Sequence, residues 1–522
     1  MLRLTGVVLG LASMALGVAV FHWPDPMLDT LEDSLYVNHF SPASTFALNC
    51  TARDNSTIAA QWLRLAYHDM ATHNATTGLG GMDGSIAFEY TRAQNIGPGM
   101  AESLIDFAVS PNQYVGMSDF IAMGAVNAVI GCGGGPVIPF RGGRKDATEA
   151  GPATVPEPQQ DLASHIDSFK DQGFNETEMI SLVACGHSFG GVRKVDFPLI
   201  VTEDVPTGIQ TFASKIGFDN TVVTEYLSGS TENVLVVGSN VSTRSDLRIF
   251  SSDNNATMQR LASLDTFNQV CADLIGRMID TVPSDVQLTE PIEPFDYKVT
   301  LDTMLFPQGG SLAFLTTLRI IENGKNQTVT LFWKERTGTF CPSEGCSISA
   351  FHVNTGVEAS LLATLKGVQS FNQHSFNASI DLATSISHFW FEVGNNDGSA
   401  PIIVDNHGTN FTIDQDVLIF DPRRSSFTIA GEFMVVGVKT SSPVDVTAFV
   451  TTTGPIGGVN PIPMPSNTTI SFTLDSAHPP ADGYTFYTSD RLPNRYSSST
   501  LHATIDGQAY SLWVPTLSAL GV

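Results

Sequence analysis

The segment Ile58–Ser85, IAAQWLRLAYHDMATHNATTGLGGMDGS, decides the fold of the N-terminal half of this chain. Its first part has the pattern of a helix, and its second part is rich in glycine and aspartate, which are typical of turns. Tyr67 and His68 follow Arg64 by three and four residues, so an α-helix places all three on one face. The sequence therefore predicts that a guanidinium, an aromatic ring and an imidazole converge on one spot.

An imidazole beside a fixed cation suits the cleavage of a peroxide bond. The imidazole takes a proton from one oxygen and returns it to the other, and the guanidinium stabilises the charge that develops. Taken alone, R-x-x-Y-H describes equally well a buried structural His68 and a surface Arg64. A second stretch, MISLVACGHSFGG, predicts a buried helix that ends in glycines and carries His187. Histidine is a natural axial ligand for iron.

Four motifs occur along the chain in the order RLAYHD, GGMDGSI, GRKDA and ACGHSFG. In this order and approximate spacing the chain resembles the plant, fungal and bacterial haem peroxidase superfamily, and most of all its secreted fungal branch. The resemblance covers roughly half of the chain. It implies a mainly α-helical domain that binds haem b, takes hydrogen peroxide as oxidant and oxidises a small aromatic or phenolic donor.

On one side of the haem, the resemblance implies that His68 and Arg64 are catalytic. Asn95, in QNIGPG, matches the asparagine that accepts a hydrogen bond from this histidine; without the other motifs it reads as a loop residue. Tyr67 stands beside the haem where the family usually has Phe or Trp. A tyrosine keeps the ring but adds an oxidisable phenol.

On the other side, the resemblance implies that His187 ligates the iron and donates its second N–H to Asp246, in RSDLRIF. A lone aspartate in that context would read as a turn residue. Arg144 and Asp146 match the segment that runs along the haem edge, where we expect both to be either structural or directed at the haem propionates.

Calcium is the second cofactor that the resemblance implies. The loop after His68 offers the hard oxygen ligands that calcium prefers, and the expected distal site consists of Asp69, Gly81, Asp83 and Ser85. Aspartate in glycine-rich turns also occurs for conformational reasons alone. A proximal cation site is expected from Ser188, Thr211 and Asp219, although Thr211 stands about where secreted members often have Asp.

The first segment and the glycosylation motifs predict a secreted glycoprotein. Residues 1–19 combine Arg3, an apolar run and small residues at the end, as in a signal peptide. No later apolar run approaches membrane-spanning length. N-x-S/T sequons are dense, as in glycosylated eukaryotic proteins, and lie at Asn49, Asn55, Asn74, Asn175, Asn240, Asn255, Asn326, Asn377, Asn410 and Asn467.

Charge and cysteine content agree with this location. The chain has 52 acidic and 26 basic residues and a formal charge of −26, which disfavours nucleic acid and anionic membranes as partners. Its 6 cysteines are even in number, which fits disulfides in an oxidising compartment. The resemblance favours a Cys50–Cys132 bridge. Cys341 and Cys346 are expected to close a local loop, whereas Cys185 either pairs with Cys271 or is a free buried thiol.

The pattern of the chain changes after Pro283. Residues 20–286, the expected peroxidase domain, contain helical periodicities separated by glycine and proline. Residues 287–522 contain short runs that alternate apolar residues with Ser or Thr, such as QTVTLFWK and HFWFEV, which predict an all-β, sandwich-like region. We expect either one unit or two units with a join near residues 395–401.

Two other functions are compatible with parts of the sequence. In the first, the chain is a secreted cell-wall or carbohydrate-binding protein whose β region contacts polysaccharide and whose helical half is a degenerate scaffold. Retention of Arg64, His68, Asn95, His187 and Asp246 argues against degeneracy. In the second, the chain is an oxygen-transferring peroxygenase, which histidine ligation disfavours because thiolate is the stronger electron donor.

Overall fold

The structure is a computed structural model that describes residues 22–38, 50–108, 110–305, 311–338, 340–343, 345–428, 431–440, 442–455, 463–493 and 496–515. The predicted signal peptide, residues 1–19, lies outside the described residues, as does the sequon asparagine Asn49. Among the residues described, no helix is long and apolar enough to cross a membrane.

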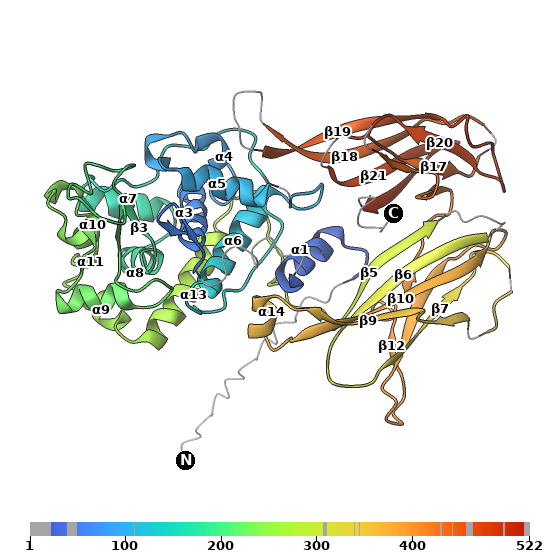
Figure 1. Ribbon diagram of the computed structural model, residues 1–522, viewed down its shortest axis with the longest axis horizontal. Coiled ribbons are helices and arrows are strands. Elements are labelled where there is room, and N and C mark those ends of the chain that lie inside the picture. Colours follow the sequence, from blue (N-terminus) through green and yellow to red (C-terminus); the bar gives the residue numbers. More distant parts are fainter. Residues whose placement is uncertain are drawn as a thin grey trace, which may run out of the picture.

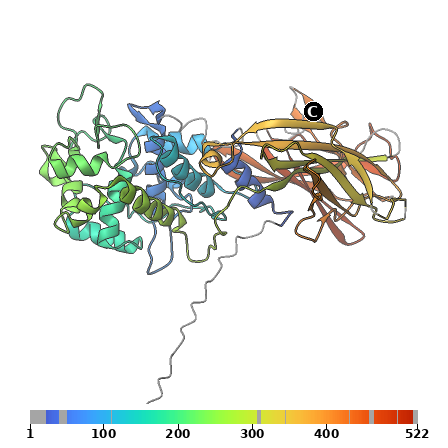
Figure 2. The same ribbon diagram turned by 90° about the horizontal axis from the view of Figure 1, so that it is seen from below.

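Helices and strands separate into two halves that lie end to end (Figures 1 and 2). The helical half contains α1 (Pro26–Tyr36), α3 (Ile58–Met70), α4 (Ile86–Glu89), η3 (Ala93–Asn95), α5 (Pro98–Phe107), α6 (Met117–Gly131), α7 (Leu162–Asp171), α8 (Glu176–Gly186), α9 (Thr221–Ser228), α10 (Val234–Val237), η4 (Val241–Thr243), α11 (Ser245–Phe250), α12 (Ala256–Leu261) and α13 (Leu264–Asp280). It also has two small hairpins, formed by β1 (Ala52–Arg53) with β2 (Ser56–Thr57) and by β3 (Gly191–Arg193) with β4 (Ile209–Thr211). The mainly α-helical fold predicted for this half is confirmed.

The second half is built from strands, with one short helix. Its elements are β5 (Tyr297–Leu305), β6 (Ser311–Ile321), β7 (Thr328–Lys334), β8 (Cys346–Ser349), β9 (His352–Glu358), α14 (Leu361–Leu365), β10 (Ser370–Asp381), β11 (His388–Gly394), β12 (Ile402–Val404), β13 (Phe411–Thr412), β14 (Leu418–Phe420), β15 (Ser426–Thr428), β16 (Gly431–Phe433), β17 (Val435–Val438), β18 (Val446–Pro455), β19 (Pro463–Leu474), β20 (Thr485–Ser489), β21 (Tyr496–Ile505) and β22 (Gln508–Pro515). The all-β character expected for this region is confirmed.

Two sheets pack face to face in the first part of this region. The longer sheet has the strand order β22-β21-β18-β19-β20-β17-β14-β5-β6-β10-β9, and the shorter has the order β12-β11-β7-β8. Phe314 of β6 contacts Phe389 of β11, and Phe376 of β10 contacts Phe391 of β11, with ring centroids 5.0 and 5.4 Å apart. Buried residues alternate with more exposed ones along β7 and β11 of the shorter sheet, as expected for a sandwich.

The part of the long sheet formed by the C-terminal strands has its own core, which includes Phe420, Val450 and Leu501. Residues 395–401 connect β11 to β12, and β12 still pairs with β11 in the shorter sheet. The second core therefore begins further along the chain, from Leu418 onwards.

The two halves share one hydrophobic core. Leu31 and Leu35 of α1 and Leu362 of α14 are buried in the same cluster as the helices of the first half. Ser360, which precedes α14, donates its backbone N–H to the Tyr36 carbonyl over 2.8 Å. In Figure 1, α1 and α14 lie between the helices and the sheets. The β region is thus packed against the helical half rather than only linked to it.

A buried charge cluster strengthens this junction. Lys298 of β5 donates to Glu32 of α1 over 3.0 Å, and Arg319 of β6 donates to the same carboxylate. The side chains of all three residues are 0 % exposed. Asp29 and Asp33 of α1 also pair with Lys298, at 3.0 and 2.9 Å. Acidic residues on one face of α1 therefore neutralise two cations of the sheet, which lowers the cost of burying them.

All six cysteines form disulfides. Cys50–Cys132 and the local Cys341–Cys346 bridge are confirmed. Cys185 pairs with Cys271, and no described cysteine is free. The alternative of a free Cys185 thiol is therefore wrong, because α8 and α13 pack together and bring the two sulfurs into contact.

Candidate active site

Helix α3 presents the first group of functional side chains. Thr57 caps its N-terminus by accepting from the backbone N–H of Ala60. Most of the helix is buried, including Trp62, which donates to Asp106 over 2.7 Å. Arg64, Tyr67 and His68 share one partly exposed face of the helix. The predicted convergence of these side chains on one face is therefore observed.

His68 is oriented by Asn95. Its Nδ1 lies 2.7 Å from the Asn95 side-chain oxygen. Asn95 is buried at the end of η3, and its Nδ2 donates to the Glu89 carbonyl over 2.9 Å, so its oxygen is directed at His68. Because that oxygen only accepts, the proton of neutral His68 resides on Nδ1. Nε2 is then left as the basic nitrogen.

Burial, and next the nearby Arg64 charge, lower the pKa of His68 to about 3. The hydrogen bond to Asn95 opposes this shift. His68 is therefore neutral across the physiological range, which is the state that a general base requires.

Arg64 is held by one backbone carbonyl of η3 and one of the residue that follows η3. Its two terminal nitrogens donate to the carbonyls of Ile96 and Gln94, each over 3.2 Å. Burial lowers the pKa of Arg64 to about 10, and the Asp196 carboxylate opposes this. The side chain remains a cation at neutral pH, fixed on the same face as His68.

Tyr67 completes this face. Its hydroxyl donates to Gln172 over 3.4 Å, and its ring centroid lies 6.0 Å from that of His68. Burial raises the pKa of Tyr67, so the phenol stays protonated.

The second histidine lies at the C-terminal end of α8. This helix begins with a capping box formed by Asn175 and Glu178. His187 is its C-cap residue, and His187 Nδ1 lies 2.8 Å from a side-chain oxygen of Asp246. Asp246 comes from α11 and is buried. The fold therefore joins two residues that are 59 positions apart.

Two further residues at this histidine were missed by the sequence analysis. Asn233 donates to the same Asp246 oxygen over 2.8 Å, so the carboxylate is held from two sides. Phe212 stacks on the His187 ring with centroids 4.1 Å apart and planes 14° apart. Neither residue lies in a quoted motif, and only the tertiary fold brings them to His187.

Two carboxylates of the segment after His68 accept hydrogen bonds from backbone N–H groups of the same segment. Asp69 accepts from the backbone N–H groups of Gly84 and Ile86, over 2.9 and 3.0 Å. Asp83 accepts from the backbone N–H of Ser85 over 3.0 Å. Burial, and next the Asp83 charge, raise the pKa of Asp69 well above its usual value, and burial also raises that of Asp83.

These features fit a bound cation. The Ser85 hydroxyl is fully buried and forms no hydrogen bond of standard geometry in the described structure. A divalent cation would offset the repulsion between Asp69 and Asp83 and satisfy this hydroxyl. Within the described ranges, however, no group of three or more His, Cys, Asp or Glu side chains is arranged to hold a metal ion. Carbonyl oxygens, such as that of Gly81, would have to complete the coordination.

The residues predicted for a proximal cation are engaged elsewhere. The Ser188 hydroxyl donates to the Cys185 carbonyl over 2.8 Å. Thr211 lies in β4 opposite Gly191. Asp219 accepts from the Thr221 backbone and from the Lys215 ammonium, over 2.7 and 3.3 Å. This site stays a prediction, and Lys215 already supplies a positive charge to Asp219.

Arg144 has a structural set of contacts. Its guanidinium bonds to Asp119 of α6 over 2.8 Å and donates to the Ile279 carbonyl of α13, and the side chain is 0 % exposed. Asp146 accepts from the N-terminal N–H groups of α6 at Met117 and Ser118. These contacts favour the structural alternative for both residues, and a propionate contact by Arg144 stays a prediction.

Comparison with known families identifies the helical half. Residues 46–263 match the family model described as "Peroxidase", and this range contains both histidines with their partners. These residues therefore form a domain of the haem peroxidase superfamily.

Several proteins that are similar to this chain are named as peroxidases. It is 34 % identical over 178 residues to "L-ascorbate peroxidase 5, peroxisomal" of Arabidopsis thaliana, an alignment that covers 33 % of this chain and 59 % of that protein. It is 31 % identical over 147 residues to "Manganese peroxidase 2" of Phlebia radiata, which covers 26 % of this chain and 37 % of that protein. Because different peroxidase types match, the secreted fungal branch stays a prediction.

Another relative extends the similarity beyond the peroxidase domain. The chain is 35 % identical over 399 residues to a "WSC domain-containing protein" of Arthroderma benhamiae, covering 73 % of this chain and 54 % of that protein. An alignment of this length reaches into the β region. The chain spans little more than half the length of the first two relatives.

Proposed function

We propose that this chain is a haem peroxidase that reduces hydrogen peroxide and oxidises a small aromatic or phenolic donor. One observation carries the proposal: two histidines from separate helices each have Nδ1 held by a buried side chain, His68 by Asn95 and His187 by Asp246. Each imidazole therefore has its Nε2 available for a reacting partner. A scaffold without peroxidase activity would not need to retain both hydrogen-bonded pairs.

The residues present fit a haem group. The acceptor at Nδ1 keeps the imidazole N–H on that nitrogen, which leaves Nε2 of His187 to ligate iron. The side chain of His187 is 29 % exposed although Asp246 behind it is buried, so the ligating edge is accessible. Haem, when bound to His187, supplies the iron centre at which peroxide is reduced and from which a donor is oxidised.

His68 and Arg64 perform the proton and charge chemistry. Nε2 of His68 accepts the proton from the proximal oxygen of hydrogen peroxide and then returns it to the departing oxygen, which leaves as water. The Arg64 guanidinium stabilises the negative charge that accumulates on the departing oxygen. Asn95 keeps the proton of the resting imidazole on Nδ1, so that Nε2 is free to accept.

We also propose calcium at the loop formed by Asp69, Gly81, Asp83 and Ser85. Asp69 directly follows His68, so a cation held there would fix the end of α3. The proximal cation at Ser188, Thr211 and Asp219 is a weaker proposal, since Lys215 already pairs with Asp219.

Secretion, glycosylation and fungal origin are part of the same proposal. Secretion and glycosylation rest on the predicted signal peptide at residues 1–19 and on the density of sequons. Fungal origin rests on the resemblance of the motifs to the secreted fungal branch. The domain limits 20–286 and 287–522 are also proposed, and the last helix of the first half ends at Asp280 while the first strand of the second begins at Tyr297. A contact of the β region with cell-wall polysaccharide is the proposed partner interaction.

The proposal is tested by haem titration and rapid mixing with hydrogen peroxide. His187→Ala should lose most haem binding, whereas His68→Ala should bind haem normally but react with peroxide orders of magnitude more slowly. His478→Ala, at a histidine of the β region whose Nδ1 bonds to Asp475 over 2.6 Å, is the matched control and should change neither property. Full haem and turnover in His187→Ala would refute the ligand, and an unchanged peroxide rate in His68→Ala would refute the base.

A further inference from the structure

The shorter sheet of the sandwich carries aromatic residues on its solvent side. Leu331 and Trp333 of β7 and Phe389 of β11 point into the core. The residues between them therefore point away from it, because successive side chains of a strand alternate. Phe332 and Trp390 lie on this outer face, where polar residues are usual in an antiparallel sheet.

Three of these rings form one surface, which we call the aromatic platform: Phe332, His388 and Trp390. Trp390 is directly opposite Phe332 across the β7–β11 pair. Their ring centroids are 5.6 Å apart and their planes differ by 12°. His388 and Trp390 are 6.0 Å apart with planes 26° apart. All three side chains are partly exposed, so the platform is open to solvent.

Polar side chains border the platform. Lys334 lies opposite His388 and Ser347 of β8 lies opposite Phe332. Thr330 and Glu392 form the next opposed pair on the same face. The outer face thus combines an apolar centre with a rim of hydroxyl, ammonium and carboxylate groups.

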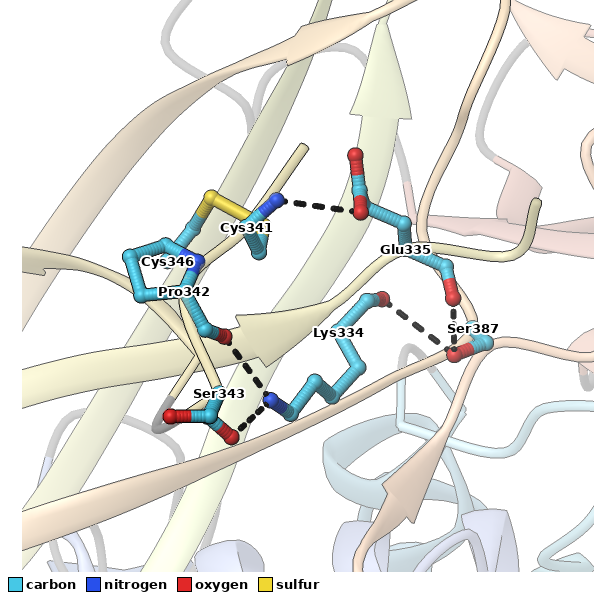
Figure 3. The surroundings of a disulfide bond; sticks show 7 residues. All are labelled: Lys334, Glu335, Cys341, Pro342, Ser343, Cys346 and Ser387. Carbon is cyan, nitrogen blue, oxygen red and sulfur yellow. Dashed lines mark hydrogen bonds between the residues drawn. A yellow bond between two sulfur atoms is a disulfide. The ribbon is translucent and has the colours of Figure 1, made fainter. Parts of the chain in front are cut away.

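The Cys341–Cys346 loop lies beside the platform, and Figure 3 shows its contacts with Lys334 and Glu335. Lys334 Nζ donates to the carbonyl of Pro342 over 3.1 Å and to that of Ser343. The Cys341 N–H donates to the Glu335 carboxylate over 3.1 Å. Gly345 of this loop abuts the indole, since a Cβ placed on it would lie 2.9 Å from a ring carbon of Trp390. A substituted residue there would displace the ring, so the bridged loop fixes the orientation of Trp390.

A purely structural account explains only part of this arrangement. An aromatic pair across two strands stabilises a sheet, which would account for Phe332 and Trp390. It does not require His388 in the same orientation, nor a disulfide loop packed against the edge of the indole. Preformed aromatic surfaces with a polar rim are instead typical of ligand sites.

We propose that the aromatic platform binds a neutral polysaccharide made of β-linked pyranoses with equatorial hydroxyls, such as glucose or N-acetylglucosamine units. Such a sugar has a flat face of C–H groups that stacks on aromatic rings, and a rim of hydroxyls that bonds to polar neighbours. This inference develops the proposed polysaccharide contact of the β region and is independent of the peroxidase chemistry.

Charge favours a neutral glycan over an acidic one. Lys334, a cation beside the platform, is already bonded to two carbonyls of the disulfide loop. Glu392 on the same face and the formal charge of −26 on the whole chain would repel a polyuronate.

The test is binding of the whole protein to cellohexaose and chitohexaose, measured by calorimetry and by tryptophan fluorescence. Trp390→Ala and Phe332→Ala should each weaken binding of the preferred oligosaccharide by about tenfold or more. Trp513→Ala is the matched control, because Trp513 of β22 is 40 % exposed and lies outside the platform. It should bind as the wild type does. Polygalacturonate should not bind to any of them.

A further variant covers the case in which loss of a ring unfolds the sheet. Ser347→Arg leaves every ring in place but lays a long side chain over Phe332, and it should also weaken binding by about tenfold. Thermal unfolding and peroxide turnover of each variant are recorded on the same preparation. Wild-type affinity in Ser347→Arg and in a folded Trp390→Ala variant, or failure of the wild type to bind either oligosaccharide, would overturn the proposal. Peroxide turnover in a protein that bound no glycan would leave the peroxidase proposal intact.

Discussion

Replacing the Asp246 carboxylate, which accepts from His187, should weaken haem binding or slow the peroxide reaction. Asp246→Asn keeps the size of the side chain but removes the negative charge that accepts from His187 and from Asn233, each over 2.8 Å. Hydrogen bonds to charged acceptors are about twice as strong as neutral ones. Loss of such a partner behind a metal ligand typically costs about 10- to 100-fold in affinity or activity, or about 1.4–2.8 kcal/mol. We expect this loss in the rate of the peroxide reaction, in haem affinity, or in both.

The second variant tests the role of Asn233 separately. Asn233 also caps α10 by accepting from Leu235 N–H over 2.9 Å. Asn233→Ser keeps a capping hydroxyl but removes the amide donor to Asp246, so its effect should be severalfold and smaller than that of Asp246→Asn. Haem affinity is read from Soret titration and the peroxide rate from stopped-flow absorbance. If Asp246→Asn matched the wild type in both measurements, the proposed role of this carboxylate would be refuted.

Three further predictions concern the base, the calcium loop and the domain junction. Because burial and the Arg64 charge lower the pKa of His68 to about 3, the peroxide rate constant should be flat above about pH 5 and fall only as His68 protonates near its pKa; an acid limb near pH 6 in stopped-flow data would contradict this. Calcium at 100 times its Kd should add about 2.7 kcal/mol to the free energy of unfolding. Asp83→Asn should abolish most of that gain, which is measured by thermal unfolding. Equal gains in the wild type and the variant would show that the loop is only a turn. Glu32→Gln leaves Lys298 and Arg319 short of one buried negative charge and should destabilise the protein by about 3–5 kcal/mol, whereas a denaturation midpoint equal to that of the wild type would show that the cluster contributes little.

Local patterns were sufficient to predict much of this molecule. The helical periodicity of α3 and the glycines after α8 placed His68 and His187 correctly on their elements. The alternation in QTVTLFWK and HFWFEV predicted β7 and β11, since a strand with one buried face has a period of two residues. The pairs His68–Asn95 and His187–Asp246 came from the resemblance and are observed as hydrogen bonds.

Tertiary packing determined what sequence patterns did not reveal. Phe212 and Asn233 reach His187 only because the segments after α8 fold back onto it. Helix α1 was not predicted, although Asp25 caps it and a proline begins it. Its acidic face is explained by its contact with Lys298, which lies 269 residues after Asp29 in the chain. Such partners leave no local signal, because each residue alone is compatible with a solvent-exposed position.

The visible spectrum of the purified protein tests the central claim most directly. The account predicts a Soret band that changes on addition of one equivalent of hydrogen peroxide and returns on addition of a phenol, and that is largely absent from His187→Ala. A wild-type protein that stays free of haem after expression with excess hemin would contradict it.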